Sequence, residues 1–130
     1  MNKENKKHPG YILIIDDDPD IRLLMKKLLV RGGYAVDTAS GKEQAWEKLS
    51  IKLPSLILLD VLLSGSDGRE LCKTLKSSEN TREVPVIIFS AHPGVAGNIE
   101  KYGADDFLSK PINSVLLLQK VDHLLSAKAN

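Results

Sequence analysis

One stretch of this sequence constrains the fold more than any other: the apolar run 12–15 leads directly into Asp16, Asp17 and Asp18. A continuous run of aliphatic and β-branched side chains is typical of a strand buried on both faces of a parallel sheet. Ligands bind open sheets of this kind at the carboxyl ends of the strands. Carboxylates crowded there repel one another unless a cation lies among them, and Mg²⁺ prefers such oxygen ligands. The stretch therefore predicts a buried strand that ends at a divalent-cation site.

A second stretch repeats this pattern. The run 56–59 is again apolar and again ends in a carboxylate, Asp60. Further strands are expected at 34–39, 84–90 and 107–108. Segments with helical spacing or capping residues separate the strands, and we expect helices at 19–31, 41–49, 67–76, 95–102 and from 114 onward.

This alternation of strands and helices predicts an α/β fold. Parallel strands joined by helices form right-handed crossovers, so helices cover both faces of one sheet. We expect a five-stranded parallel sheet in the order 2-1-3-4-5, which is a flavodoxin-like three-layer sandwich. Asp18, followed by Pro19, is expected to cap the first helix, and Asn113 is expected to cap the last one.

Residues that can carry chemistry follow four of the predicted strands. They are Asp16, Asp17, Asp60, Ser90 and Lys110. Because parallel strands end at one edge of the sheet, these residues can converge although they are spread over most of the chain. Taken alone, Asp60 fits a turn, Lys110 a solvated surface charge, and Ser90 a local backbone hydrogen bond. Their combination favours a functional site.

The order of these motifs makes the chain similar to the receiver domains of two-component response regulators, over residues 11–126. The resemblance rests on the pair Asp16-Asp17, on Asp60 within the run 60–68, on Ser90-Ala91 and on Lys110-Pro111. It implies a CheY-like (βα)5 fold and a switch that is controlled by phosphorylation.

The resemblance also implies a role for each site residue. Asp60 is expected to be the phosphoacceptor, whose carboxylate attacks a phosphoryl group to give an aspartyl phosphate. Asp17 is expected to bind Mg²⁺ directly, and Asp16 mainly through water. Asp60 would add one carboxylate oxygen, and Leu62 its backbone carbonyl. Lys110 is expected to offset negative charge on Asp60 and later on a phosphoryl oxygen.

Ser90 and Phe107 are expected to carry the conformational switch. The Ser90 hydroxyl would move to the phosphoryl group, and Phe107, by default a core residue, would turn inward into the space left. A cis peptide bond before Pro111 is expected to aim Lys110 inward. The implied phosphoryl donor is a sensor histidine kinase or a phosphotransfer protein, and the implied target is an unidentified downstream protein.

Length and composition narrow the remaining options. The 130 residues fit one domain, expected at 11–127 behind a flexible polar tail at 1–10. With 18 basic and 17 acidic side chains, the chain has no overall electrostatic footprint for nucleic acid. The tail resembles neither a signal peptide nor a membrane anchor. Cys72, the only cysteine, favours a reducing, cytoplasmic setting and is expected in a helix core.

Two features depart from the family pattern. Ser64 stands where many receivers have proline, which should loosen the loop after Asp60. The segment 90–110 is rich in glycine and slightly short. It predicts a fourth helix that is short, frayed or displaced, with high mobility.

Two other functions remain open at this point. A domain that has kept the fold but does not use phosphate would be a protein-interaction module, although such domains usually lack an acid, the acceptor or the lysine. A metal-dependent phosphohydrolase on a similar sheet would need a second acid two residues beyond the nucleophile, where Leu62 stands. We therefore expect no enzyme acting on external substrates, only a domain that catalyses its own phosphorylation and slow dephosphorylation.

Overall fold

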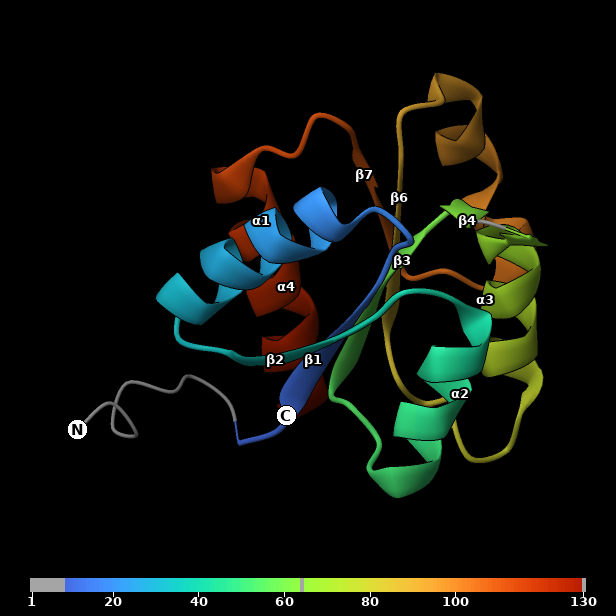
Figure 1. Cartoon of the computed structure of the whole chain (residues 1–130), viewed down its shortest axis with the longest axis horizontal. Coiled ribbons are helices and arrows are strands. Elements are labelled where there is room, and N and C mark those ends of the chain that lie inside the picture. Colours follow the sequence, from blue (N-terminus) through green and yellow to red (C-terminus); the bar gives the residue numbers. More distant parts are fainter. Residues whose placement is uncertain (1–8, 64, 130) are drawn as a thin grey trace.

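The computed structural model describes residues 9–63 and 65–129, and its centre is one parallel sheet (Figure 1). The strands of this sheet are β1 (Tyr11–Ile15), β2 (Ala35–Ala39), β3 (Leu56–Asp60), β6 (Val86–Ser90) and β7 (Asp106–Ser109). Their order is β2-β1-β3-β6-β7. The predicted order 2-1-3-4-5 is confirmed, because β4 and β5 belong to a separate hairpin.

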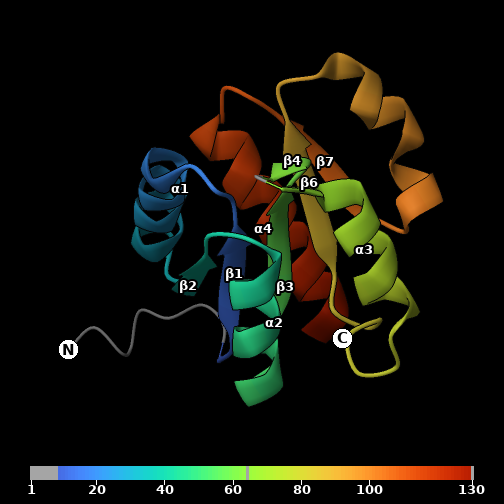
Figure 2. The ribbon, with the colours of Figure 1, turned by 45° about the vertical axis from the view of Figure 1, so that its right-hand side comes forward.

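Helices cover both faces of the sheet, as predicted. The elements are α1 (Pro19–Arg31), α2 (Lys42–Ile51), α3 (Gly68–Ser77), the 3-10 helix η2 (Pro93–Tyr102) and α4 (Ser114–Ala129). Helices α1 and α4 lie on one face, and α2, α3 and η2 lie on the other (Figures 1 and 2). Within the described ranges, no helix is both long enough and apolar enough to cross a bilayer.

Alternate side chains of each strand supply two hydrophobic cores. Ile12 and Ile14 of β1 belong to the core beneath α1 and α4, whereas Leu13 and Ile15 belong to the core beneath α2 and α3. Cys72 is fully buried in the second core, as expected, and its Sγ donates to the carbonyl of Tyr102. Burial on both faces explains why the central strands are continuous apolar runs.

The predicted helix caps are present. The Asp18 carboxylate accepts a hydrogen bond from the backbone N–H of Asp20 at 2.9 Å, and Pro19 begins α1. The Asn113 side chain accepts one from the N–H of Leu116 at 3.0 Å, at the start of α4. Both contacts satisfy backbone donors that have no partner within the helix.

The structure differs from the sequence expectation in two segments. The weak helical signal at 95–102 corresponds to a 3-10 helix over Pro93–Tyr102, which is followed by Gly103 with a φ of +80°. The loop after Asp60 contains a short antiparallel hairpin, β4 (Leu62–Leu63) with β5 (Ser66–Asp67). Strands of two residues have no detectable hydrophobic period, so they could not be predicted from the pattern. Ser64 and residues 1–8 of the expected tail lie outside the described residues.

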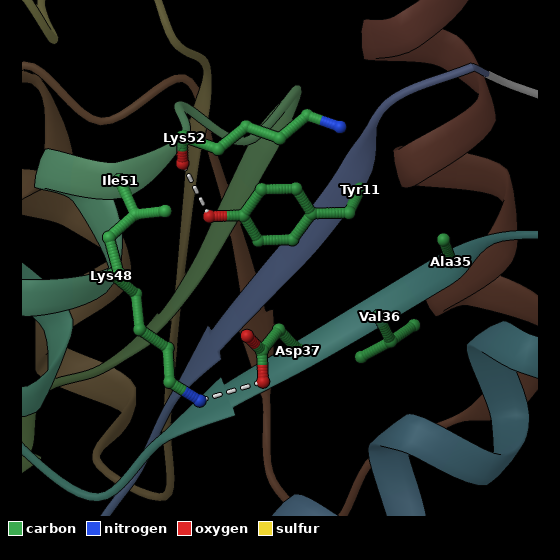
Figure 3. A pocket seen from close by; sticks show the side chains of 7 residues that line it. All are labelled: Tyr11, Ala35, Val36, Asp37, Lys48, Ile51 and Lys52. Atoms are coloured by element: carbon green, nitrogen blue, oxygen red, sulfur yellow. Dashed lines mark hydrogen bonds and ion pairs between the residues drawn. The ribbon is translucent and has the colours of Figure 1, made fainter.

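The open edge of the sheet at β2 is protected by side chains. The Thr38 N–H donates to Asp37 Oδ1 at 2.8 Å, and the Thr38 carbonyl accepts from Lys48 Nζ at 2.6 Å. Lys48 also forms an ion pair with Asp37, drawn in Figure 3 beside a pocket that Tyr11 and Ile51 help to line. Free backbone groups on an edge strand invite pairing with another chain, so these contacts disfavour extension of the sheet at β2.

Candidate functional site

Three carboxylates meet at the carboxyl edge of the sheet. Asp16 and Asp17 follow β1, and Asp60 is the last residue of β3. One oxygen from each lies within 4.8 Å of the others. Asp16 is completely buried and Asp60 is 5% exposed, whereas Asp17 is exposed. The neighbouring pairing of β1 with β3 accounts for this convergence.

The Lys110 ammonium group bridges two of these acids. Its Nζ lies 3.4 Å from Asp60 Oδ1 and 3.5 Å from Asp16 Oδ2. Lys110 follows β7 directly, and its backbone N–H donates to the carbonyl of Ser90 at 2.9 Å. The Lys110–Pro111 peptide bond is cis. The lysine therefore reaches the acid cluster from the far side of β6.

Burial perturbs both inward acids. Desolvation is the largest effect on Asp16 and raises its pKa from 3.8 to about 6, with a smaller rise from Asp60 and opposing effects from the Asp18 N–H and Lys110. Desolvation also raises the pKa of Asp60, and Lys110 and the N–H of Leu62 oppose that rise. The site therefore holds more carboxylate charge than one lysine neutralises, which favours binding of a further cation.

The loop that carries the acid pair is held by backbone contacts. Asp16 Oδ1 accepts from the Asp18 N–H at 2.9 Å, and the Asp16 N–H donates to the carbonyl of Ala39 at 3.1 Å. Arg22 Nη1 donates to the Asp16 carbonyl at 2.6 Å. Helical spacing predicts that Arg22 faces solvent together with Lys26, but its side chain is half-buried against this loop. Helical spacing alone could not distinguish it from the exposed Lys26.

The loop after Asp60 turns back tightly beneath that residue. Gly68 donates its N–H to the carbonyl of Val61 at 2.7 Å. A Cβ atom at Gly68 would lie 1.9 Å from the Asp60 carbonyl oxygen, so only glycine fits. Leu62, which is 56% exposed, begins the hairpin two residues after Asp60.

Ser90 and Phe107 lie on neighbouring strands. Ser90 ends β6 and is buried, and its Oγ accepts from the N–H of His92 at 3.0 Å. Phe107 of β7 is half-buried and packs against the core beneath α2, α3 and η2. In the sheet, Phe107 pairs with Ile88, two residues before Ser90. A buried hydroxyl and a partly exposed aromatic ring thus lie on neighbouring strands, two positions apart in the register.

The donor set fits a hard divalent cation. Three carboxylates at one sheet edge are oxygen ligands of the type that Mg²⁺ takes, and Asp17 is exposed enough to leave part of a cation's shell to water. The cluster contains no sulfur or imidazole ligand, so the chemistry of the site favours Mg²⁺ over softer transition metals.

Fold and site together define a doubly wound α/β domain with a cluster of acids bridged by a lysine at its switch point. The model of the response regulator receiver domain family matches residues 12–122, and the chain belongs to this family.

Relatives and solved structures agree with this membership. The chain is 39% identical to the response regulator PleD of Caulobacter vibrioides over 120 residues, which cover 90% of the chain and 26% of PleD. It superposes on a two-component response regulator from Clostridium difficile with a TM-score of 0.84 at 32% identity, covering 93% of this chain and 99% of that one. It also matches the receiver domain of a signal transduction histidine kinase from Syntrophus aciditrophicus, with a TM-score of 0.83, 36% identity and 91% of each chain covered. The chain thus spans about a quarter of the length of PleD.

Proposed function

We propose that Asp60 is the phosphoacceptor of this receiver domain. The observation that carries the proposal is the contact of Lys110 Nζ with Asp60 Oδ1 at 3.4 Å, inside a cluster of three acids. A carboxylate oxygen of Asp60 attacks phosphorus, and the bond from phosphorus to the donor atom breaks. The donor leaves with the electron pair of that bond, and Asp60 becomes an acyl phosphate.

Positioning and charge compensation are the main requirements of this transfer. Asp17, one oxygen of Asp60 and the Leu62 carbonyl would hold Mg²⁺ directly, and Asp16 mainly through water; the bound ion would supply positive charge to the phosphoryl oxygens. Lys110 provides a second positive charge beside the acceptor oxygen. Asp16 also contacts Lys110, because the ammonium group lies 3.5 Å from its carboxylate.

Ser90 and Phe107 are proposed to transmit the change. The Ser90 hydroxyl turns from the His92 N–H toward a phosphoryl oxygen, and Phe107 rotates into the space that opens. The surface that changes is formed by η2, β7 and α4. Because phosphorylation favours one of two arrangements, the bound phosphoryl group selects the partner-binding state.

The proposed donor is the phosphohistidine of a sensor kinase or of a phosphotransfer protein, and the proposed recipient is a downstream protein that binds the altered surface. Residues 11–127 are the proposed functional unit, acting in the cytoplasm. No external substrate is turned over, because the position two residues beyond Asp60 is the apolar Leu62 and not a second acid.

Intact-mass spectrometry after incubation with acetyl phosphate and Mg²⁺ tests the proposal. We expect the wild type to gain one phosphoryl group only when Mg²⁺ is present, and the Asp60→Asn variant to gain none. Asp67→Asn is the matched control, because Asp67 lies on the same loop but caps α3 instead of entering the acid cluster. An adduct on Asp60→Asn, or no adduct and no Mg²⁺ binding by the wild type, would overturn the proposal, the second result favouring a phosphate-independent interaction module.

A further inference from the structure

The ring of Phe89 lies beside the ammonium group of Lys110. Lys110 Nζ is 5.2 Å from the centroid of this ring. Phe89 is completely buried in the core beneath α1 and α4. It precedes Ser90 in β6 and pairs with Asp60 of β3 on one side and, on the other, with Leu108 of β7, two residues before Lys110.

The two carboxylates alone hold the ammonium group loosely. Distances of 3.4 and 3.5 Å exceed the 2.7–2.9 Å that is usual for a charge-assisted hydrogen bond. A lysine side chain has a flexible four-carbon stem and loses considerable entropy when it is fixed. A third contact is therefore needed to explain why Nζ stays between Asp16 and Asp60.

The face of an aromatic ring supplies such a contact. Its negative quadrupole attracts a cation within about 6 Å of the centroid, and the attraction is stronger where water is excluded. Asp16, Asp60 and Phe89 are all buried at this point, and Lys110 itself is 22% exposed at its side chain. An aliphatic residue would keep this position apolar but would offer no charge distribution to the ammonium group.

We propose that Phe89 is a positioning residue for Lys110, whose ring holds the ammonium group over the acceptor carboxylate. The expected effect of Phe89 on the rate of phosphoryl uptake rests on the proposed function. The position of Lys110 beside the ring does not, because it is a property of the unphosphorylated protein. Phe89 acts through Lys110 and makes no contact with the phosphoryl group in this account. In this site the lysine is thus held by two carboxylates and an aromatic ring, and not by carboxylates alone.

Two variants at position 89 separate the ring's charge distribution from its volume. Phe89→Leu removes the ring. Site-specific replacement of Phe89 by a trifluorinated phenylalanine keeps the ring but weakens the negative electrostatic potential over its face. Because the fluorinated ring keeps the shape of phenylalanine, this protein can be tested even if Phe89→Leu does not fold. Ile87→Val is the matched control, because Ile87 is buried in the same strand and the same core.

The first readout is the NMR signal of the Lys110 ε-methylene protons, which a nearby ring face shifts upfield. The second is the rate of phosphoryl uptake from acetyl phosphate. We expect both position-89 variants to move the Lys110 signal and to slow uptake by about threefold to tenfold, while Ile87→Val leaves both near wild type. A fluorinated protein with wild-type uptake and an unchanged Lys110 environment would overturn the inference. If the wild type itself takes up no phosphoryl group, the proposed function fails, and the Lys110 signal still decides whether Phe89 positions the lysine.

Discussion

Lys110 Nζ lies 3.4 Å from Asp60 Oδ1 although the two residues belong to different strand connections, one after β7 and one at the end of β3. The same nitrogen lies 3.5 Å from the fully buried Asp16. One ammonium group therefore serves two buried carboxylates, with the exposed Asp17 beside them. The excess negative charge favours binding of a further cation, and a change at any one of these residues is expected to alter the electrostatics of the others.

Replacing Lys110 by alanine should destabilise the Mg²⁺-free protein by roughly 1–3 kcal/mol, because Asp16 and Asp60 lose their bridging cation. We expect the variant to retain some phosphoryl uptake but to lose the conformational response, because no ammonium group is left to form an ion pair with a phosphoryl oxygen. Chemical denaturation measures the first effect, and amide shifts in β7 and α4 measure the second. Lys120→Ala, which breaks only the partly exposed pair with Asp106, should cost about 1 kcal/mol or less. Wild-type amide shift changes on phosphorylation of Lys110→Ala would contradict this prediction.

The raised pKa of Asp16 predicts how stability depends on pH without Mg²⁺. Its pKa rises from 3.8 to about 6 on folding, so between these values the native state holds a proton that the unfolded state has lost. Stability then falls as pH rises through this window, and the penalty is complete above about pH 6. We expect the free energy of unfolding to increase by about 1 kcal/mol when the pH is lowered from about 7 to about 5, because only one pH unit of this interval lies below the folded pKa of about 6.

Urea denaturation in the presence of a chelator measures this dependence. Asp16→Asn mimics the protonated acid, so it should be more stable than wild type near neutral pH and should show a much smaller pH dependence. Asp18→Asn is the control, because Asp18 is an exposed helix cap on the same loop and asparagine caps helices equally well. The prediction is wrong if Asp16→Asn keeps the wild-type pH dependence.

A methyl group at Gly68 should disturb the acceptor directly. The added Cβ would lie 1.9 Å from the Asp60 carbonyl oxygen and 2.9 Å from Val61 Cα, and both are backbone atoms that cannot rotate away. We expect Gly68→Ala to cost roughly 2–4 kcal/mol in unfolding free energy and to slow phosphoryl uptake. Gly94→Ala, whose Cβ meets nothing within 4 Å, should change stability by less than about 0.5 kcal/mol. Equal stabilities for the two variants would refute the packing argument.

The 3-10 helix η2 should open more readily than the α-helices. Its hydrogen-bond geometry is poorer than that of an α-helix, and the segment contains Gly94 and Gly97. We expect its amides to exchange at least about tenfold faster than those in the interior of α1. Exchange in η2 as slow as in α1 would show that the segment is a rigid part of the fold.

Much of the architecture could be predicted because the central strands are buried on both faces. The runs that end at Asp16 and Asp60 are continuous and apolar, so their positions, the strand order and the convergence of the acids follow from the pattern. The cap residues Asp18 and Asn113 could be identified for a different reason: helix capping depends on residues that are neighbours in the sequence.

What could not be predicted depends on tertiary contacts. Arg22 has the spacing of an exposed helix residue, and only the folded β1–α1 loop shows that it binds the Asp16 carbonyl. Phe89 is one apolar residue in a buried strand, and its contact with Lys110 requires the pairing of β6 with β7. The strands of the β4–β5 hairpin have two residues each, which is too short for a hydrophobic period to predict them.

The central claim is that Asp60 itself accepts the phosphoryl group, and chemical mapping of the modified residue tests it most directly. After incubation with acetyl phosphate and Mg²⁺, borohydride reduces an acyl phosphate to the alcohol and so converts a phosphorylated aspartate to homoserine, which peptide mass spectrometry locates. We predict homoserine at Asp60 and at no other aspartate. Homoserine at Asp16 or Asp17, with Asp60 unmodified, would contradict the account.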